Sequence, residues 1–277
     1  DGVLRSKISG LRAIWNGRGM AKRLYESFAR TAVVGFGGYP AMPALLAAFS
    51  MKIPTVVHEQ NAVLGRVNRY AARKVNAIAT AYPDVQKIST ELTHKVHLVG
   101  NPVRAEVLAL RKDPFPLLDE DGIFRVLVTG GSQGASILSD VVPDGLAMLP
   151  INLRRRLQVT QQCRAEDIER VRARYAENEI PAELATYLPD LPDRLGYAHL
   201  VIARAGASTI AELTCIGRPA ILVPLPSAMD NHQAFNVKEM VAAGGARAIP
   251  QSAFTSKELA KQIQKIALTP DALDNAA

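Results

Sequence analysis

Short apolar runs alternate with longer amphipathic segments along most of this chain. Short apolar runs bounded by turn residues are typical of buried strands, and apolar positions at helical spacing are typical of helices that cover a sheet. The predicted strands are 32–35, 55–57, 77–81, 96–99, 124–129, 157–160, 200–203 and 220–223. The predicted helices are 41–50, 64–73, 135–149, 165–178, 209–216 and 234–243. This alternation predicts an α/β fold with parallel sheets covered by helices.

A polar segment interrupts the alternation and predicts a domain boundary. Residues 108–122 contain Asp113-Pro114-Phe115-Pro116 and the acidic run 119–121. Proline removes a backbone donor and acidic runs stay solvated, so we predict a first domain at 1–107, a linker at 108–122 and a second domain at 123–277. Both halves share one order of strand, glycine turn, helix, strand and His/Gln loop, which predicts two Rossmann-like domains facing each other across a cleft.

Composition and charge narrow the class of protein. The chain has 277 residues, 48% hydrophobic and 21% charged, which indicates a globular protein of two ordinary domains. Its two cysteines predict no disulfide framework. No apolar run approaches the roughly 18 residues of a membrane helix. The acidic run 119–121 is predicted to be a solvated turn, and we predict no metal site.

The positive charge is concentrated at the start of the chain. Residues 1–77 carry twelve Lys or Arg and three Asp or Glu, so their net charge is +9 within a total of +7. This asymmetry predicts an anionic partner for the first part, and the low aromatic content argues against nucleic acid. Residues 8–30 form a basic amphipathic pattern with Trp15. It is typical either of a helix lying on a membrane or of an ordinary helix packed on a sheet.

The segment 201–236 carries the most informative chemistry. An apolar strand runs into a small-residue turn and then a helix start, where free N–H groups favour an anion. Glu212 lies one turn into this helix and is suited to accept from neighbouring hydroxyls, as on a ribose. Gln233 and Asn236 offer amides suited to sugar hydroxyls. The segment therefore predicts a nucleotide-sugar pocket.

Four other segments and Arg204 are candidate binding elements, and all except the polar run 58–61 have a simpler structural interpretation. Gly-rich turns at 35–38 and 130–134 follow strands and are either anion cradles or tight connections. Arg104 and Arg204 follow strands and could pair with phosphate, although Arg104 is equally a surface residue and Arg204 could simply close its turn. The polar run 58–61 follows a buried-type strand and favours a functional role.

Six motifs occur in order, namely GFGGY at 35–39, HEQN at 58–61, GNPVR at 100–104, GGSQGA at 130–135, RAGASTIAE at 204–212 and DNHQAFN at 230–236. Together they resemble the MurG family of bacterial cell-wall glycosyltransferases over nearly the whole chain. The resemblance implies a two-domain GT-B fold and inverting transfer of N-acetylglucosamine (GlcNAc) from UDP-GlcNAc to the 4-hydroxyl of the muramyl sugar (MurNAc) of lipid I. The product, lipid II, serves peptidoglycan synthesis, cell shape and division.

The resemblance also implies partners and site residues. It implies a peripheral position on the anionic cytoplasmic face of the inner membrane, no cofactor, no metal ion and no nucleic acid. The implied donor-site residues are Arg104 and Ser132 at the diphosphate, Arg204 as a further candidate there, Leu188 at the uracil through its backbone, Ala207, Ser208 and Thr209 at the helix start, Glu212 at the ribose, and Gln233 and Asn236 at the sugar. Asn61 would lie near the transfer point. Glu59 is the first candidate for the proton acceptor and His58 the second.

The chain also departs from the family pattern. The family's opening strand and a Gly-rich loop ending in a histidine have no counterpart here, the stretch 10–33 is shorter than in the family, and the family's final helices are missing. We therefore expect a chain cut at both ends, which binds UDP-sugar through its second half and lacks an acceptor-side loop needed for turnover.

Three other interpretations stay open. A UDP-sugar 2-epimerase or diacylglycerol glucosyltransferase would share the fold, and a non-catalytic binding module would share the pocket. An NAD-dependent oxidoreductase would share the glycine turn at 130–134. Short-chain dehydrogenases, however, carry a Tyr-x-x-x-Lys after that turn, whereas Tyr70 and Lys74 precede it.

Overall fold

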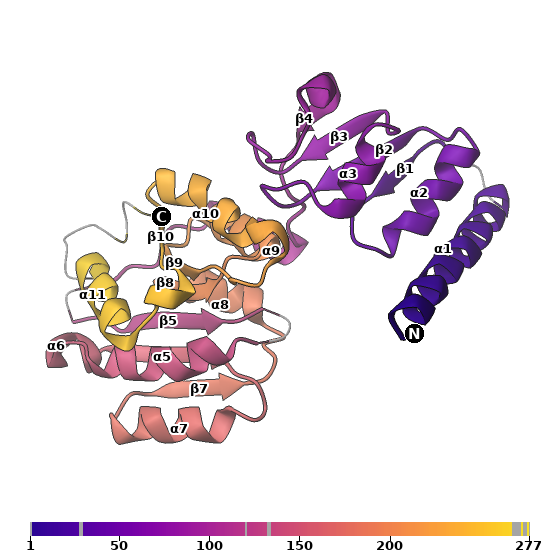
Figure 1. The fold of residues 1–277 in the computed structure, drawn as a ribbon. Helices are drawn as coiled ribbons and strands as arrows, with labels where there is room; N and C mark the ends of the chain where they lie inside the picture. Colours follow the sequence, from indigo (N-terminus) through magenta and orange to yellow (C-terminus); the bar gives the residue numbers. More distant parts are fainter. Residues whose placement is uncertain are drawn as a thin grey trace. The chain divides into compact units, whose positions relative to one another are not determined.

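The computed structural model describes residues 2–27, 30–119, 121–131, 134–267, 273 and 276. The chain divides into two compact units, Asp1–Asn101 and Pro102–Ala277. Each unit is a parallel sheet with helices (Figure 1). The predicted α/β class is therefore confirmed.

The first unit contains a four-stranded sheet. Its elements are α1 (Gly2–Ser27), β1 (Val33–Gly35), α2 (Ala41–Ser50), β2 (Thr55–Glu59), α3 (Arg66–Ala72), β3 (Ala77–Thr80), the 3-10 helix η1 (Thr90–Lys95) and β4 (Val96–Leu98). The strand order is β1-β2-β3-β4, and every pair is parallel. Parallel pairing places the carboxyl ends of all four strands at one edge, where the loops after β1 and β2 lie together.

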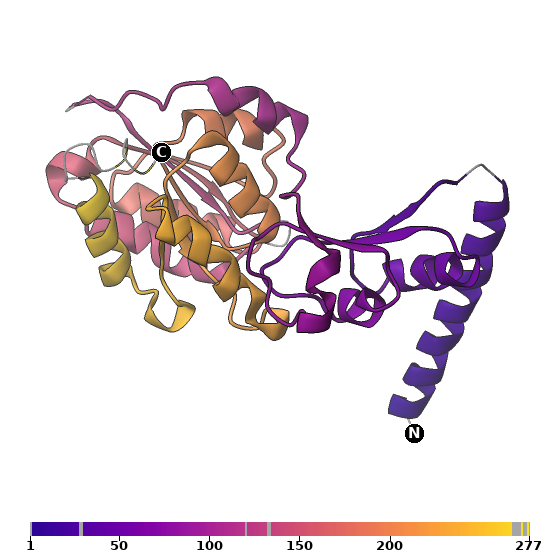
Figure 2. The same cartoon turned by 90° about the horizontal axis from the view of Figure 1, so that it is seen from above.

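Helix α1 packs against α2 (Figures 1 and 2). Tyr25 is buried in a small apolar cluster with Ala47, Ala48 and Ile53. Trp15 lies on the same helix and is 66% exposed. The predicted amphipathic helix therefore forms, with one side on α2 and apolar residues on its exposed side. Within the described part of the chain, no helix combines the length and apolarity needed to cross a membrane.

The second unit contains a six-stranded sheet. Its elements are α4 (Ala105–Ala109), η2 (Leu110–Lys112), β5 (Phe124–Thr129), α5 (Ser136–Ala147), α6 (Ile151–Arg154), β6 (Leu157–Gln162), α7 (Ile168–Glu177), β7 (Ala182–Ala185), α8 (Leu191–Tyr197), β8 (Leu200–Arg204), α9 (Ala207–Ile216), β9 (Ala220–Val223), η3 (Met229–Asn231), α10 (His232–Ala242), β10 (Ala246–Ala248), η4 (Gln251–Ala253) and α11 (Ser256–Ala267).

Strand order gives this unit a topological switch point. The order is β10-β9-β8-β5-β6-β7, and all pairs are parallel. The chain winds outward from β5 through β6 to β7 and then returns to β8, on the other side of β5. This is the Rossmann order, in which ligands bind outside the carboxyl ends of the two central strands. Here those strands are β5 and β8.

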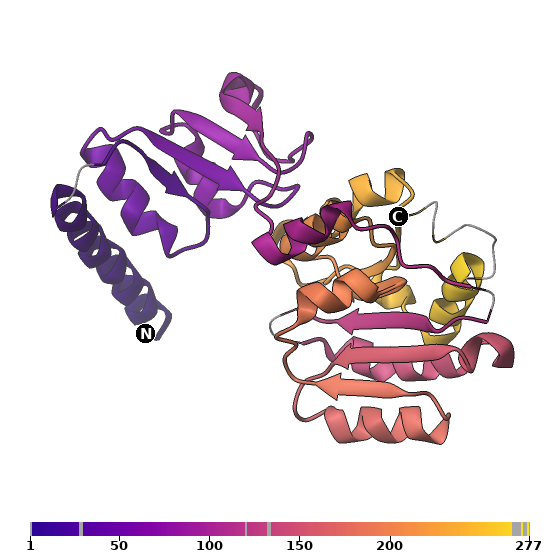
Figure 3. The same ribbon diagram turned by 180° about the vertical axis from the view of Figure 1, so that it is seen from behind.

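Alternating side chains of the central strands bury both faces of this sheet. Val126, Val128 and Ile202 belong to one apolar cluster with α5, α7 and α11, whereas Leu127 and Val201 belong to the other with α8, α9 and α10. Figure 3 shows the sheet from behind, with helices on both sides. Strands buried on both faces read as continuous apolar runs, which is why the sequence made them easy to find.

All eight predicted strands and all six predicted core helices are confirmed, with small shifts at their ends. The sequence did not predict the strands β7 and β10 or the helices α4, α6, α8 and α11. The division into units also differs from the predicted boundaries, because 102–122 belongs to the second unit rather than to the first domain and the linker. Val107 of α4 is fully buried in the cluster that contains Leu213, and this apolar contact fixes α4 to the second unit.

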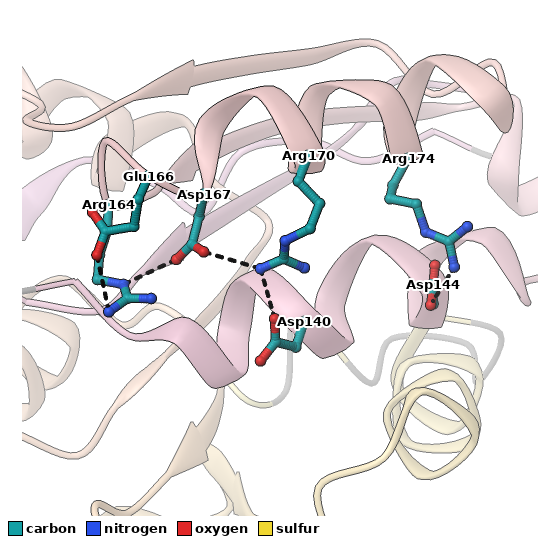
Figure 4. A network of polar contacts seen from close by, with 7 residues as sticks. All are labelled: Asp140, Asp144, Arg164, Glu166, Asp167, Arg170 and Arg174. Atoms are coloured by element: carbon teal, nitrogen blue, oxygen red, sulfur yellow. Dashed lines mark hydrogen bonds and ion pairs between the residues drawn. The ribbon is translucent and has the colours of Figure 1, made fainter.

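Ion pairs connect α5 to the segment that begins α7 (Figure 4). Asp167 accepts from Arg164 (2.9 Å) and from Arg170 (3.0 Å), and Arg170 also donates to Asp140 on α5 (2.7 Å). Farther along, Arg174 donates to Asp144 (2.9 Å). The hydrogen bond from Arg164 is the largest cause of a lowered pKa at Asp167. These pairs fix α7, which also packs against β7, to α5.

Candidate active-site regions

The loop after β5 begins with two glycines that the fold requires. A Cβ on Gly130 would lie 2.4 Å from the backbone N of Ala135, so any larger residue would force the turn open. Gly131 has φ +79°, a conformation that other residues rarely adopt. The hydroxyl of Thr129 donates to Oε1 of Gln162 (2.8 Å), which fixes the strand end below the loop. Ser132, the predicted diphosphate residue of this loop, lies outside the described residues.

Helix α9 begins at the end of β8, on the other side of the switch point. Its N-cap residue is Gly206, which has no side chain to cap the first turn. Ser208 is exposed, and Ala207 and Thr209 are partly exposed. The first N–H groups of a helix have no intrahelical acceptor and carry partial positive charge. This end of α9 therefore has the geometry of the predicted anion site.

The structure brings Arg104 and Glu212 together. Nε of Arg104 donates to Oε1 of Glu212 at 2.6 Å, and Nη2 donates to Oε2 at 2.9 Å. The Glu212 side chain is 12% exposed and that of Arg104 is 45% exposed. The hydrogen bond to Glu212 is the main cause of a raised pKa at Arg104. In this conformation the predicted diphosphate and ribose residues therefore bind each other, at the solvent margin of the second unit.

Two other predicted donor-site residues, Arg204 and Gln233, support loops in this conformation. The guanidinium of Arg204 donates to the carbonyl of Val223 (3.2 Å) and to Oε1 of Gln251 (2.7 Å). Burial lowers the pKa of Arg204. Gln233 is partly exposed, and its Oε1 accepts from the backbone N of Leu225 (3.0 Å). Arg204 therefore connects the end of β9 to η4, and its contact with phosphate stays a prediction.

Asn236 and Leu188 are both buried. Asn236 is fully buried, and its Nδ2 donates to the carbonyl of Ala205 (3.3 Å), just before the N-cap of α9. It cannot touch a sugar hydroxyl in this conformation, because no part of the residue is exposed; it supports the start of α9 instead. Leu188 packs its side chain in the α8–α9 cluster, so only its backbone is available for the predicted uracil contact.

The polar residues after β2 form a buried hydrogen-bond cluster in the first unit. Oε1 of Glu59 accepts from the backbone N of Asn61 (3.1 Å) and from its Nδ2 (3.2 Å). Oε2 accepts from the backbone N of Gly65 (2.8 Å) and from Nδ2 of Asn68 (2.9 Å). Glu59 is 2% exposed. Four donors thus occupy the carboxylate, and a structural role competes with its predicted role as proton acceptor.

His58 is also buried beside this cluster. Its Nε2 lies 2.9 Å from the carbonyl of Gly100, so Nε2 carries the proton and donates. Nδ1 is buried and has no hydrogen-bond partner among the residues that the structure describes. The ring lies 5.4 Å from that of Phe36, in the loop after β1. His58, on β2, therefore connects the loops that follow β1 and β4 at the carboxyl edge of the sheet, and its role as proton acceptor stays a prediction.

Sequence analysis did not select Asn68 and Arg218. Asn68 is 1% exposed and lies among Val67, Ala71 and Ala72 on the buried face of α3. The sequence signal that could have found Asn68 is a polar residue at a position of the helix where an apolar residue is expected. Arg218 is also 1% exposed and donates to backbone carbonyls at the ends of α8 and α9. No sequence pattern near Arg218 predicts this burial or these partners. In the described part of the chain, no group of three or more His, Cys, Asp or Glu residues could hold a metal ion.

Comparisons with known proteins agree on one family. The N-terminal domain of glycosyltransferase family 28 matches residues 2–80, and its C-terminal domain matches residues 125–277. Curated relatives from Novosphingobium aromaticivorans (70% identical) and Zymomonas mobilis (63%) match 98% and 100% of this chain, which spans 70% and 71% of their lengths. Both are named UDP-N-acetylglucosamine–N-acetylmuramyl-(pentapeptide) pyrophosphoryl-undecaprenol N-acetylglucosamine transferase.

Solved structures show the same fold. The crystal structure of MurG from Acinetobacter baumannii is 29% identical, with a TM-score of 0.76 over 98% of this chain and 74% of its own. A UDP-GlcNAc 2-epimerase from Neisseria meningitidis shares the fold at 14% identity, with a TM-score of 0.68 over 96% of this chain and 76% of its own. The chain therefore belongs to glycosyltransferase family 28, and its two parallel-sheet units are the Rossmann-like domains of a GT-B fold.

Proposed function

We propose that this protein transfers GlcNAc from UDP-GlcNAc to the MurNAc 4-hydroxyl of lipid I, with inversion, in peptidoglycan synthesis. Relatives up to 70% identical over nearly the whole chain carry the name of this activity. The observation that supports it in the structure is the arrangement at the switch point. There an uncapped start of α9 lies one turn before Glu212, which holds Arg104.

The donor nucleotide fits this arrangement by its chemistry. The diphosphate needs positive charge and N–H donors, which the start of α9 and Arg104 supply. The ribose has two neighbouring hydroxyls, which the two oxygens of Glu212 can accept. Binding the nucleotide therefore requires Arg104 to exchange the Glu212 carboxylate for phosphate oxygens, while Glu212 accepts the ribose instead.

The same groups account for the departure of UDP in the chemical step. In a direct displacement, the acceptor hydroxyl attacks the anomeric carbon and gives its proton to a base, while the bond to UDP breaks and leaves its electron pair on the diphosphate. Arg104 and the amides of 207–209 are placed to stabilise this growing charge. Removing one such donor from an active site typically costs about 3–4 kcal/mol of transition-state stabilisation.

The test is a transfer assay with the full gene product, labelled UDP-GlcNAc and a soluble lipid I analogue. We expect a disaccharide product with this acceptor and none when its 4-hydroxyl is replaced by hydrogen. Conversion of UDP-GlcNAc to its 2-epimer without acceptor would instead identify an epimerase. Binding of NAD with no binding of UDP would identify the oxidoreductase.

A peripheral contact with an anionic membrane is the second part of the proposal. Trp15, Met20 and Leu24 are exposed large apolar residues on α1. Beside Trp15 lies a cavity of about 730 Å³ whose lining includes Arg18, Lys52 and Lys74. Among the described residues that line it there is no acidic side chain. Apolar groups surrounded by cations suit the headgroup region of an anionic bilayer.

The chain contains one tryptophan, so its fluorescence reports on α1 alone. We expect the emission to shift to shorter wavelength with phosphatidylglycerol vesicles and to stay unchanged with phosphatidylcholine vesicles. Replacing Arg12, Lys22 and Arg23 with Gln should weaken this binding. A control that replaces the exposed Arg172, Lys257 and Lys261 of the second unit removes the same charge and should bind as before. Equal loss in both variants would contradict a specific contact through α1.

A further inference from the structure

The hydrogen-bond geometry of Glu59 indicates a function other than proton transfer. Each of its carboxylate oxygens accepts two N–H groups. A carboxylate that takes up a proton turns one acceptor oxygen into a hydroxyl donor, which would then face N–H donors. Protonation would therefore cost at least one charge-assisted hydrogen bond in a site that is almost fully buried.

We infer that Glu59 is a positioning residue for the transfer reaction. Its Oε1 holds both the backbone and the side-chain amide of Asn61, and its Oε2 holds Gly65 and Asn68. One carboxylate thus fixes the two ends of the loop 61–65 and joins it to α3. The role of this loop in transfer rests on the proposed function, in which Asn61 lies near the transfer point.

Asn68 extends this arrangement to the loop after β1. Its Nδ2 also donates to the carbonyl of His58 (3.1 Å). A Cβ on Gly37 would lie 3.2 Å from Nδ2 of Asn68, so the loop after β1 packs closely on the same amide. Gln60 adds a second connection, because its Nε2 donates to the carbonyl of Phe36 (3.1 Å). The loops that follow β1 and β2 therefore depend on the Glu59–Asn68 pair for their shape.

The variant Glu59→Gln tests this inference. Gln keeps the shape, but it presents N–H groups to one pair of donors. We expect kcat to fall about 10- to 100-fold, the scale of a misplaced reacting group, with KM for UDP-GlcNAc changed less than about threefold. The pH profile of kcat should keep its acidic limb. If Glu59 were the proton acceptor, that limb would disappear.

Asn68→Ala separates the two roles further. It leaves the Glu59 carboxylate in place and removes one of its donors. A positioning role predicts a fall in kcat of about tenfold, and a double variant no slower than Glu59→Gln alone, because both changes release the same loop. A proton-acceptor role predicts instead that Asn68→Ala moves the acidic limb of the kcat profile to higher pH, because a carboxylate that loses a donor takes up a proton more readily. That result, or a lost acidic limb in Glu59→Gln, would overturn the inference.

Thr55→Val is the matched control for stability. Thr55 lies at the opposite end of the same strand, is 1% exposed, and donates to the carbonyl of Ile53 (2.8 Å). We expect it to lower the melting temperature of the first unit without changing kcat. If Glu59→Gln and Asn68→Ala behaved in the same way, the cluster would serve stability alone.

Backbone hydrogen exchange tests whether Glu59 holds the loop 61–65, and it needs no enzymatic turnover. In wild type, the backbone amides of Asn61 and Gly65 should exchange slowly, because Glu59 accepts from both. They should lose protection in Glu59→Gln and keep it in Thr55→Val. If the wild-type protein transferred no GlcNAc, the proposed function would fail, while these amides would still show whether Glu59 holds the loop. Unchanged protection in Glu59→Gln would overturn the inference.

Discussion

Replacing Glu212 by Gln gives a sharp test of the donor site. The substitution keeps the size of the side chain and removes its charge. In the free protein, Glu212 accepts two hydrogen bonds from Arg104. In the proposed complex it accepts the ribose hydroxyls instead. The variant therefore loses one interaction before binding and a different one after binding.

The effect on stability follows from the exposure of the pair. A hydrogen bond to a charged group contributes about 1.5–3 kcal/mol when buried. Glu212 is nearly buried but Arg104 is 45% exposed, so water screens the pair and we expect a loss of about 0.5–1 kcal/mol. For a unit of this size, each kcal/mol lowers the melting temperature by about 2–4 °C.

The effect on binding is the difference between two terms. Loss of the charged ribose acceptor costs about 1.5–3 kcal/mol. In wild type, however, Arg104 must first leave Glu212, and the weaker pair in the variant returns about 0.5–1 kcal/mol of that cost. The net loss is about 1–2 kcal/mol, which corresponds to a roughly 5- to 30-fold higher Kd for UDP.

Calorimetry with UDP measures this directly, and Glu183→Gln is the matched control. Glu183 also pairs through both oxygens with an arginine, Arg194 (2.5 and 2.8 Å), within the same unit. The control should lose stability in the same direction and keep its UDP affinity. If Glu212→Gln bound UDP as wild type does, or if both variants lost affinity equally, the assignment of Glu212 to the ribose would be refuted.

Three further predictions concern the second unit. Burial lowers the pKa of His199, so the unfolded chain binds the proton more readily and the unit should lose stability as pH falls below about 6.5; in thermal melts, His199→Gln should flatten this dependence. Arg218→Met leaves buried carbonyls without their donor and should lower the free energy of unfolding by about 2–4 kcal/mol in urea titrations; a loss under 1 kcal/mol would contradict this. Gly130→Ala should weaken UDP binding more than tenfold by calorimetry, because its Cβ would lie 2.4 Å from the N of Ala135; unchanged affinity would show that this turn does not contact the nucleotide.

The sequence by itself determined the alternation of strands and helices and the places where glycine turns meet helix starts. These features are local. A strand buried on both faces is a continuous apolar run, and a helix that must begin directly after a strand needs small residues at the turn. For this reason, β5, β8 and the start of α9 could be predicted from the sequence. The short strand β7 was not, because it lies at the edge of the sheet and its sequence, Ala-Glu-Leu-Ala, has no continuous apolar run.

Only the tertiary structure decided which polar side chains meet. Arg104 and Glu212 are 108 residues apart in sequence, and their pairing depends on α4 packing beside α9. The run 58–61 was predicted to have a functional role, and that role stays a prediction. However, a sequence does not show that the Glu59 carboxylate is filled by Gly65 and Asn68. Hydrogen-bond partners are set by distances of a few ångströms after the chain has folded, whereas strands and turns are set by the chemistry of adjacent residues.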